Sequence, residues 1–300
     1  MTHIEGLITA PFTPFDASGE VNTAMVGRLQ QFYKDNGIAG VFICGTTGES
    51  SALTFEEKKM LFEEWSRYKT DDFKIIGFLG GTSVKDCQNL ARVAQDCNLD
   101  AISITAPYYF KPTGVAELAA FCGKVASATD LPFYYYHIPT FTDVYYNMYD
   151  LLELVDEKIP NFAGIKFTYE NMMDFQRCLE FKNRKYNILW GRDEMLLAAL
   201  AIGATGAVGS TYGYIAPLYL QIIETFNQSN LDEARRLQLK AIEYITFLNR
   251  YGGSTGKAFM KAVGMDCGNY RLPVRNLNDE QMQQFMTELK ATDFFDYCSK

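Results

Sequence analysis

Lys166 is the residue with the clearest chemical potential, because it lies inside an otherwise apolar run. Residues 163–168, Ala-Gly-Ile-Lys-Phe-Thr, have the composition of a β-strand. Side chains alternate along a strand, so Lys166 shares one face with Gly164 and Thr168, and apolar residues take the other face. If that face is the protein interior, desolvation lowers the lysine pKa from about 10.4 towards about 7. A neutral amine attacks a ketone to form a Schiff base, whereas the alternative is a lysine that reaches solvent or pairs with an acid.

A glycine-bounded turn offers a second chemical feature. Residues 45–50 read Gly-Thr-Thr-Gly-Glu-Ser and follow a predicted strand. The hydroxyls of Thr46 and Thr47, together with free backbone N–H groups, form a concave set of donors that suits a carboxylate or a phosphate. The alternative is a tight connection in which both threonines satisfy their own backbone.

Tyrosines and carboxylates follow other predicted strands. Alternation in the Tyr-Tyr-Tyr run at 134–136 places Tyr136 on the inner face, where a phenol tuned by a nearby amine or iminium can move a proton. Core packing of an aromatic strand is the alternative. Asp193 and Glu194 either bind hydroxyl groups or form the acidic first turn of a helix. The remaining candidates at strand ends are Tyr109, Gly191 and Ser210.

Eight strands that alternate with helices must position these residues. We expect strands at residues 6–15, 41–45, 74–80, 101–107, 133–138, 162–168, 187–191 and 206–210. We expect helices at 25–36, 54–69, 83–96, 116–128, 149–156, 172–181 and 195–202, with a capping box at Thr54 and Glu57. Eight such units within about 228 residues match the length and rhythm of a (β/α)8 TIM barrel. In this α/β fold, residues at the C-terminal ends of the strands meet at one mouth.

A doubly wound open sheet is the alternative fold, but the chain contains neither GxGxxG nor GxxxxGK[ST]. Residues 251–258 resemble the second motif without its first glycine and its final Ser or Thr, so we expect a loop there. Helical patterns at 231–249, 257–263 and 279–289 follow the eighth unit. We therefore predict a catalytic barrel at 1–228 and a C-terminal helical extension at 229–300 that packs on the barrel or on a neighbouring subunit.

An amine nucleophile, a carboxylate-binding turn, a phenol and an acidic pair at one mouth are the parts of a Schiff-base aldolase that acts on an α-keto acid. Three motifs resemble the N-acetylneuraminate lyase and dihydrodipicolinate synthase superfamily of class I aldolases. The family pattern GxxGE is present at 45–49, the lysine pattern G[IL]K at 164–166, and the tyrosine pattern as Tyr136 before Ile-Pro at 138–139. The resemblance runs from residue 6 to about residue 210.

The resemblance implies a role for each of these residues. Lys166 forms the imine, and Tyr136 moves a proton on and off the aldol hydroxyl. Thr46 and Thr47 hold the substrate carboxylate. Tyr109 corresponds to a residue that reaches into the active site of a neighbouring subunit, which implies a homo-oligomer, most often a tetramer built as a dimer of dimers.

The two branches of the superfamily differ at a few positions. Synthase-type members carry an arginine for a second carboxylate two residues after the proline, where this chain has Phe141. Lyase-type members carry Ser or Thr two residues after the lysine and a Gly-x-Asp-Glu segment, matched here by Thr168 and by residues 191–194. Arg192 departs from the uncharged residue that the lyases have. The lyase branch implies a polyhydroxyl tail bound by Thr168, Gly191, Asp193, Glu194 and Ser210.

The lyase branch implies reversible cleavage of N-acetylneuraminate to pyruvate and N-acetyl-D-mannosamine, with no metal or organic cofactor. One alternative is an aldolase for another 2-keto-3-deoxy sugar acid, in which Arg192 would meet a charged substrate. The others are dihydrodipicolinate synthase and a non-catalytic barrel that binds a sugar acid. The intact lysine, tyrosine and threonines argue against the non-catalytic barrel.

Composition and charge limit the classes of ligand that we expect this chain to bind. The 300 residues are 48% hydrophobic, and 28 Lys and Arg against 36 Asp and Glu give a net charge of −8, which argues against nucleic-acid binding. The start of the sequence lacks a leader pattern, and the longest apolar run, at 195–204, is far shorter than the about 20 residues that span a membrane. Seven scattered cysteines without CxxC and two histidines predict a cytoplasmic protein with reduced thiols and no zinc site. Small molecules are therefore the expected ligands.

Overall fold

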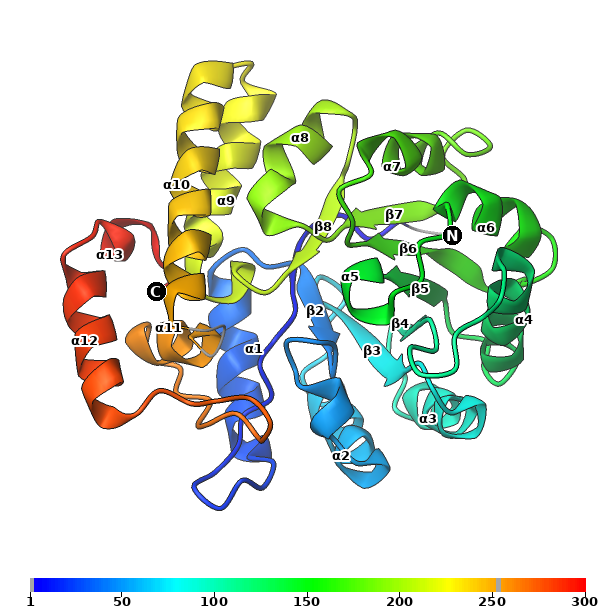
Figure 1. Cartoon of the computed structure of the whole chain (residues 1–300), viewed down its shortest axis with the longest axis horizontal. Coiled ribbons are helices and arrows are strands. Elements are labelled where there is room, and N and C mark those ends of the chain that lie inside the picture. Colours follow the sequence, from blue (N-terminus) through cyan, green and yellow to red (C-terminus); the bar gives the residue numbers. More distant parts are fainter. Residues whose placement is uncertain (1–2, 252–254) are drawn as a thin grey trace.

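Eight parallel strands close into one barrel in the computed structural model (Figure 1). Neighbours in sequence are neighbours in the barrel, and the first strand pairs with the eighth to close it. The strands are β1 Gly6–Thr9, β2 Gly40–Ile43, β3 Lys74–Gly80, β4 Ala101–Thr105, β5 Phe133–His137, β6 Phe162–Phe167, β7 Asn187–Trp190 and β8 Gly206–Gly209. The predicted (β/α)8 barrel is therefore confirmed.

Helices surround the barrel and continue beyond it. The structure describes residues 3–251 and 255–300, so residues 252–254 of the expected loop at 251–258 lie outside the described residues. The end of that segment is helical and not a loop, because a helix begins at Gly256. The helices after strands β1 to β8 are α1 Val26–Asp35, α2 Phe55–Ser66, α3 Val84–Asp96, α4 Val115–Ala126, α5 Pro139–Thr142, α6 Met148–Val155, α7 Met172–Leu179, α8 Leu196–Ala201 and α9 Tyr212–Asn227. The C-terminal helices are α10 Leu231–Arg250, α11 Gly256–Ala262, α12 Asp279–Lys290 and α13 Phe294–Tyr297.

The predicted helix starts agree with the structure where side chains cap the helix. Thr54 Oγ1 accepts the Glu57 N–H at 3.2 Å, and Glu57 Oε2 accepts the Thr54 N–H at 2.8 Å, which completes the expected capping box. Ser83 caps α3 in the same way by accepting the Asp86 N–H at 3.2 Å. Such caps satisfy backbone donors that the first helical turn leaves free, and they fix where the helix begins.

The structure differs from the sequence-based expectation in several elements. The short helices α5 and α13 were not expected, and the two largest differences lie at prolines. β1 ends at Thr9 rather than at residue 15, because Pro11 and Pro14 have no N–H to donate to a neighbouring strand. The sequence pattern indicates no helix between residues 210 and 231, but α9 fills this interval. It is interrupted at Ile215, two residues before Pro217, which obscures its helical pattern in the sequence.

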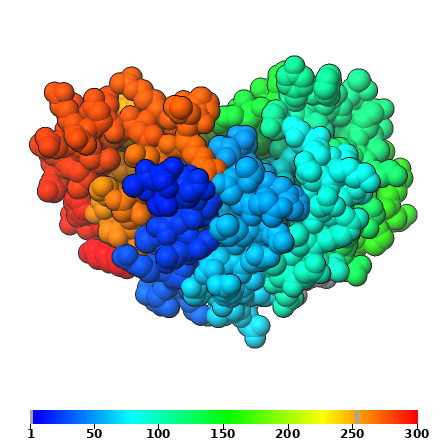
Figure 2. Space-filling view, turned by 90° about the horizontal axis from the view of Figure 1, so that it is seen from below, coloured from blue at the N-terminus to red at the C-terminus, as the bar shows by residue number. Residues whose placement is uncertain are grey.

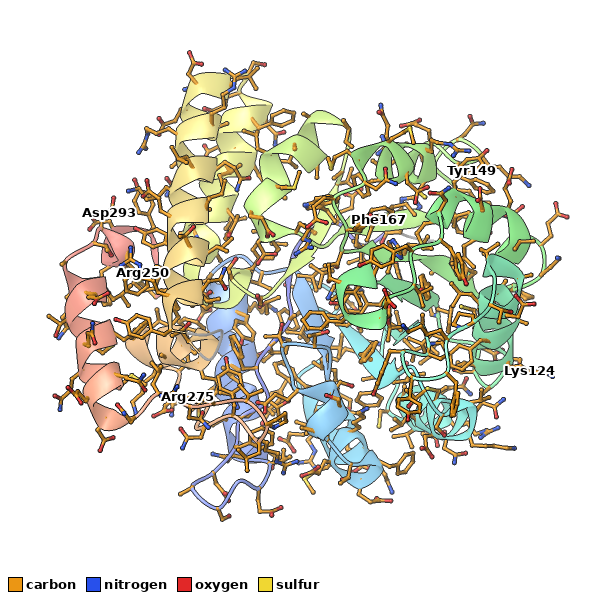
Figure 3. All side chains as sticks on the ribbon, viewed as in Figure 1. Lys124, Tyr149, Phe167, Arg250, Arg275 and Asp293 are labelled. Atoms are coloured by element: carbon orange, nitrogen blue, oxygen red, sulfur yellow. The ribbon has the colours of Figure 1, made fainter. Side chains whose placement is uncertain are left out.

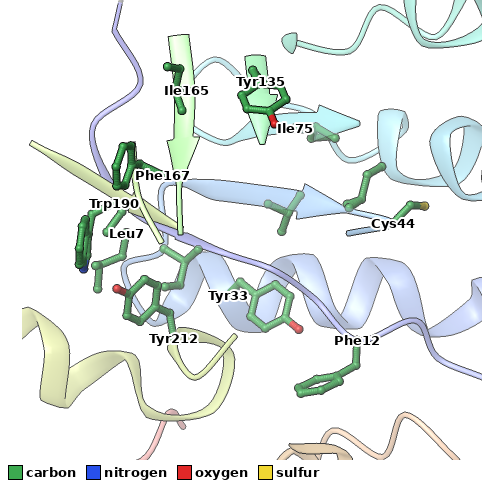
Figure 4. Close-up of a cluster of buried hydrophobic side chains, with 14 of the residues drawn as sticks. Leu7, Phe12, Tyr33, Cys44, Ile75, Tyr135, Ile165, Phe167, Trp190 and Tyr212 are labelled. Atoms are coloured by element: carbon green, nitrogen blue, oxygen red, sulfur yellow. The ribbon is translucent and has the colours of Figure 1, made fainter. Parts of the chain in front are cut away.

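The strands separate two packed layers of side chains. Figure 4 shows part of the outer layer, in which Ile165 and Phe167 of β6 lie near Trp190 of β7, and helices cover this layer. Figure 3 places Phe167 well inside the molecule and Lys124 of α4 at its rim. The inner layer fills the barrel and includes Phe42, Tyr134, Tyr136, Leu189 and Val208. The predicted alternation is observed at residues 134–136 and from Ile165 to Phe167, whereas a register shift between β5 and β6 places Ala163 in the inner layer as well.

The C-terminal helices lie to one side of the barrel (Figure 1). Helix α10 packs along α9, and α11 and α13 also contact α9. The extension thus packs mainly on the helix that follows β8, and α10 also contacts α8. Within the described part of the chain, no helix is both long enough and apolar enough to cross a membrane.

Candidate active site

Lys166 points into the barrel and is almost completely buried. The residue is 4% exposed. Its Nζ atom lies 4.1 Å from the centroid of the Phe42 ring and 4.0 Å from that of the Tyr136 ring. Burial lowers the pKa of Lys166 to about 7, while the negative charge of Asp193 acts in the opposite direction. A large fraction of this amine is therefore neutral and nucleophilic near neutral pH.

Tyr136 is the neighbour of Lys166 across the sheet. The two residues are register partners on β5 and β6, so their side chains leave the sheet on the same face. The Tyr136 hydroxyl lies 3.5 Å from Thr46 Oγ1, and the Phe42 and Phe78 rings pack edge-on against the Tyr136 ring. Burial raises the pKa of Tyr136 to about 12, so this side chain is a neutral phenol before any substrate binds.

The turn after β2 presents unpaired donors beside Tyr136. Within the described chain, the backbone N–H groups of Thr46, Thr47 and Gly48 donate no hydrogen bond. The turn is closed behind them, because Ser50 N–H donates to the Gly45 carbonyl at 3.1 Å and Thr13 Oγ1 donates to the Gly48 carbonyl at 2.6 Å. Free N–H groups on a fixed turn form a binding site for an anion.

Asp193 lies at the end of β7 and is held from the neighbouring strand end. Its Oδ2 atom accepts the Thr211 N–H at 2.9 Å and the Thr211 hydroxyl at 2.6 Å. Burial raises the pKa of Asp193 to about 6, against the effect of these hydrogen bonds. A Cβ atom at Gly209 would come within 1.9 Å of Asp193 Oδ1, so only glycine allows this close approach. Asp193 is therefore a buried carboxylate in a fixed orientation beside the lysine.

Thr168 and Gly191 are in contact where β6 and β7 end. A Cβ atom at Gly191 would come within 1.9 Å of Thr168 Oγ1, which explains the glycine at this position. Thr168 is 7% exposed, and within the described residues its hydroxyl makes no hydrogen bond of good geometry. The hydroxyl nevertheless acts to lower the pKa of Tyr136, as Thr46 also does. A buried hydroxyl without a partner at a barrel mouth is available to a ligand.

Arg192 forms a charged cluster at the outer rim of this end. Its guanidinium pairs with Glu170, which follows β6, and its Nη1 atom lies 3.5 Å from Glu194 Oε1. The Arg192 carbonyl accepts a hydrogen bond from Trp190 Nε1 at 2.5 Å, which fixes the backbone. One cation between two carboxylates leaves the cluster with a net negative charge, so it does not form a free anion site.

A cavity of about 410 Å³ opens beside Tyr136. It is bounded by Thr46, Thr105 and Phe141 on the side of the barrel mouth, and it extends to Lys58 of α2. The phenyl ring of Phe141 lies on the short helix α5 and is 71% exposed, so the cavity wall has no guanidinium at this position. Thr105 supports the site by donating its hydroxyl to the Tyr136 carbonyl at 2.9 Å.

The structure brings most of the predicted site residues to one mouth, but not all of them into contact. Tyr109 is 80% exposed and packs edge-on against Phe110, outside the cluster around Lys166. Ser210 is half-buried at the end of β8, and no described side chain donates to or accepts from its hydroxyl. Among the residues that the structure describes, neither Tyr109 nor Ser210 has a contact that assigns it a role.

Three supporting residues were missed by sequence reasoning. Thr211 follows the predicted Ser210, and Thr105 ends β4 with its side chain at the mouth. Glu170 lies in the connection after β6. Thr105 could have been found from strand alternation, since it lies in register with Tyr136. The partners Thr211 and Glu170 carry no signal in the sequence, because loop geometry brings them to Asp193 and Arg192.

The chain was compared with known proteins. Residues 3–292 match the model described as the dihydrodipicolinate synthetase family. The N-acetylneuraminate lyase of Mus musculus is 37% identical to this chain in an alignment that covers 97% of this chain and 93% of the relative. The solved structure of the Proteus mirabilis N-acetylneuraminate lyase has a TM-score of 0.94 and 38% identity, with 98% of this chain and 100% of that chain covered. A dihydrodipicolinate synthase from Bacillus anthracis has a TM-score of 0.90 and 26% identity, with coverage of 97% and 99%.

Proposed function

The chain belongs to the dihydrodipicolinate synthetase family, and from this premise we propose that it is a class I aldolase that cleaves N-acetylneuraminate reversibly to pyruvate and N-acetyl-D-mannosamine. It is a carbon–carbon lyase. The observation that carries the proposal is the buried amine of Lys166, with a pKa of about 7, in register with the Tyr136 phenol. Schiff-base catalysis needs such a neutral amine beside a group that can move a proton.

The first step is formation of the imine. The neutral Lys166 amine attacks the ketone carbon of the open-chain sugar acid to give a carbinolamine. The carbinolamine hydroxyl then takes the proton of the Tyr136 phenol and leaves as water, which gives a positively charged iminium and the Tyr136 phenolate. Both Nζ–ring distances near 4 Å place aromatic faces beside this cation. Aromatic faces stabilise a desolvated cation, so they favour the iminium as well as the protonated amine.

The second step is cleavage of the carbon–carbon bond. The Tyr136 phenolate accepts the proton of the substrate hydroxyl on the carbon beyond the one next to the iminium. The hydroxyl carbon becomes an aldehyde and leaves, and the bonding electrons pass into the iminium to form an enamine. The enamine takes the proton back at carbon, and water then releases pyruvate and regenerates Lys166. A cation formed 4 Å from the Tyr136 ring favours the phenolate and so opposes the effect of burial on its pKa.

Binding of the substrate is divided between the two ends of the mouth. The free N–H groups of residues 46–48, with the hydroxyls of Thr46 and Thr47, hold the carboxylate next to the ketone. Thr168, Gly191, Asp193, Glu194 and Ser210 hold the polyhydroxyl tail. A carboxylate that accepts a hydroxyl hydrogen bond contributes about 1.5–3 kcal/mol, so a few such contacts select a sugar acid.

Two observations favour the lyase reaction over the synthase reaction. Phe141 borders the cavity where a synthase uses an arginine, and a phenyl ring has no donor for a second carboxylate. The identity to the lyases of Mus musculus and Proteus mirabilis is 37% and 38%, against 26% to the Bacillus anthracis synthase. The net negative cluster around Arg192 also favours an uncharged tail over a phosphorylated or acidic one.

The wider setting of the enzyme is part of the proposal. Tyr108, Tyr109 and Phe110 form an exposed aromatic segment after β4. We propose that this segment packs on a second copy in a homotetramer, with Tyr109 completing the neighbouring site. The mechanism uses no cofactor, and we place the protein in the cytoplasm, where its free cysteines would stay reduced. The barrel at 1–228 would carry the catalytic residues, and the extension at 229–300 would support it.

Reductive trapping tests the proposal directly. Pyruvate with borohydride is expected to add one reduced adduct at Lys166, located by peptide mass, and N-acetylneuraminate is expected to release pyruvate. Label on another lysine, or no label, would contradict the Schiff-base mechanism. Condensation of pyruvate with aspartate semialdehyde, without cleavage of N-acetylneuraminate, would instead assign the synthase reaction. Label at Lys166 with neither reaction would point to a different sugar acid.

A further inference from the structure

Glu49 ends the carboxylate-binding turn, and its side chain contacts two residues of the C-terminal extension. Glu49 Oε1 lies 2.9 Å from Lys257 Nζ, and Glu49 Oε2 accepts the backbone N–H of Arg271 at 2.9 Å. The Glu49 and Lys257 side chains are only 6% and 4% exposed. The turn after the second strand is therefore tied to a segment near the other end of the chain.

Several contacts fix the position of the Lys257 amine. Its Nζ atom donates to the Asn269 carbonyl at 2.9 Å and lies 4.4 Å and 4.8 Å from the centroids of the Phe15 and Tyr270 rings. Burial lowers the pKa of Lys257, and Glu49 opposes this shift. A buried charge that loses its counter-charge is strongly disfavoured, so the position of Lys257 constrains the position of Glu49.

Arg271 holds the chain just beyond the turn. Its Nη1 atom donates to the Ala52 carbonyl at 2.9 Å and to Glu57 Oε2 at 2.9 Å, and its Nη2 atom donates to the Gly19 carbonyl at 2.7 Å. One residue of the extension thus contacts Glu49, the segment after it and the start of α2. Figure 2 shows the orange C-terminal segment pressed against the blue N-terminal part of the chain.

The turn itself has a conformation that needs support. Cys44 and Glu49, which flank it, have φ angles of 57° and 59°, in the left-handed region that non-glycine residues rarely adopt. Between them lie the three N–H groups that point to no acceptor in the described chain. Strained residues persist where surrounding contacts hold them, and at Glu49 the side-chain contacts come from the extension.

We propose that Lys257 and Arg271 act through Glu49 as positioning residues, which hold the turn in the geometry that binds the substrate carboxylate. The inference rests on the proposed function, because it takes the turn as the carboxylate site. A buried ion pair is a poor source of stability, since desolvation offsets most of the attraction, so a fixed geometry is the better explanation for keeping it. The C-terminal extension is then a working part of the active site.

Two single variants break the pair from opposite sides. Glu49→Gln keeps the hydrogen bond to Arg271 N–H and leaves Lys257 without a counter-charge, and Lys257→Met removes the cation. Each is expected to raise the KM for N-acetylneuraminate and for pyruvate by about tenfold, with kcat changed by less than about threefold. Lys261→Met is the matched control, because Lys261 lies on the same helix in an exposed pair with Asp266 at 2.9 Å. Its KM is expected to be unchanged.

The double variant Glu49→Gln/Lys257→Met removes both charges and is expected to recover most of the lost affinity. Equal KM values in the single variants and the unaltered protein, with only a lower melting temperature, would give the pair a purely structural role and overturn the proposal. If a single variant does not fold, Glu49→Asp carries the test, since it keeps the charge and shortens the side chain. Its KM is expected to rise by about threefold, and an unchanged KM overturns the proposal.

A measurement without substrate separates this inference from the proposed function. Backbone amide exchange at residues 45–48 is expected to accelerate in Glu49→Gln and Lys257→Met and to stay unchanged in Lys261→Met. Faster exchange with no pyruvate trapping in the unaltered protein would mean that the proposed function failed while the positioning contact stands. Unchanged exchange in a protein that does trap pyruvate would mean that the positioning inference failed.

Discussion

The two ends of the barrel mouth differ in burial and in charge. The end formed by β2, β5 and β6 is buried and aromatic, and its amine lies between two rings at about 4 Å. The end formed by β7 and β8 is charged, and its outermost members Arg192 and Glu194 have side chains that are 22% and 35% exposed. The first end changes the pKa of Lys166 and of Tyr136 by excluding water, whereas the outer part of the second end pairs its charges with one another.

This difference separates reactivity from selection. Desolvation at the buried end makes Lys166 a nucleophile. Substitution of such a buried group changes the reaction rate by several orders of magnitude. Charge pairs at the exposed end are screened, so each contributes little energy, but together they decide which tail fits. Variants at the buried end should therefore change kcat, and variants at the exposed end should mainly change KM and substrate preference.

Lys166→Met tests the buried end most severely. The variant loses the nucleophile, so cleavage is expected to fall by about 10⁴-fold or more, while the thioether fills similar space. The folded protein should also become more stable, because the lysine pKa of about 7 in the fold lies below its ordinary value of about 10.4. The unfolded chain then binds the extra proton between these pH values, so the cost of keeping the amine buried is full below pH 7 and disappears above about pH 10.

Urea unfolding of Lys166→Met measures this trade-off. The gain in unfolding free energy is expected to be about 4 kcal/mol at pH 7 and about 2 kcal/mol at pH 9, as an upper range. A variant that is inactive and less stable than the unaltered protein at both pH values would show that the amine is well solvated or paired in the fold. That result would remove the basis for a neutral lysine.

Tyr136→Phe removes the phenol and keeps the ring against Lys166. We expect kcat to fall by about 10²-fold with a smaller change in KM, because a proton relay acts in the transition state. Tyr134→Phe is the matched control, since Tyr134 lies on the same strand and face and donates its hydroxyl to Asn187 Oδ1 at 2.9 Å, away from the lysine. Equal kcat values for the two variants would make Tyr136 a packing residue.

Asp193→Asn tests how far the two ends are independent. Loss of the carboxylate weakens contacts with the sugar hydroxyls, so cleavage of N-acetylneuraminate is expected to fall by about tenfold while pyruvate is still trapped. The rate of trapping falls at low pH as Lys166 becomes protonated, with a midpoint near pH 7. Asp193 favours the protonated amine, so its removal should move this midpoint to lower pH. An unmoved midpoint would mean that Asp193 serves the tail alone.

Much of the buried end could be predicted from the sequence, because it depends on the alternation of side chains within single strands. Alternation along one strand places Lys166 on the inner face, and the same rule places Tyr136 there. The structure adds that these residues are register partners, a relation between strands that are about 30 residues apart in sequence. Helix starts agreed with the prediction where Thr54 and Ser83 cap them, and strand boundaries agreed least in the proline-containing segment after Thr9.

The exposed end and the supports of the site could not be predicted, because their contacts join distant loops. The alternative of another sugar acid has Arg192 contact a charged substrate. In the structure, Arg192 pairs with Glu170, which lies in the connection after β6. Likewise, no periodicity indicates that Glu49 contacts Lys257 and Arg271. Such pairs depend on where the closed barrel brings its loops, and only a three-dimensional structure contains that information.

Arg192→Gln is expected to have the smallest effect and to define the exposed end most sharply. The substitution breaks partly exposed ion pairs, which contribute about 0–1 kcal/mol, so the KM for N-acetylneuraminate should rise by no more than about fivefold with kcat unchanged. Glu170→Gln is the opposite change, because it leaves Arg192 with one carboxylate instead of two. Measured against a sugar acid with a phosphorylated tail, Glu170→Gln should raise kcat/KM relative to N-acetylneuraminate, and Arg192→Gln should lower it. The unaltered protein could instead prefer the phosphorylated substrate, and Arg192→Gln could abolish that preference. This result would reverse the assignment of an uncharged tail, since Arg192 would then bind the substrate rather than its two neighbouring glutamates.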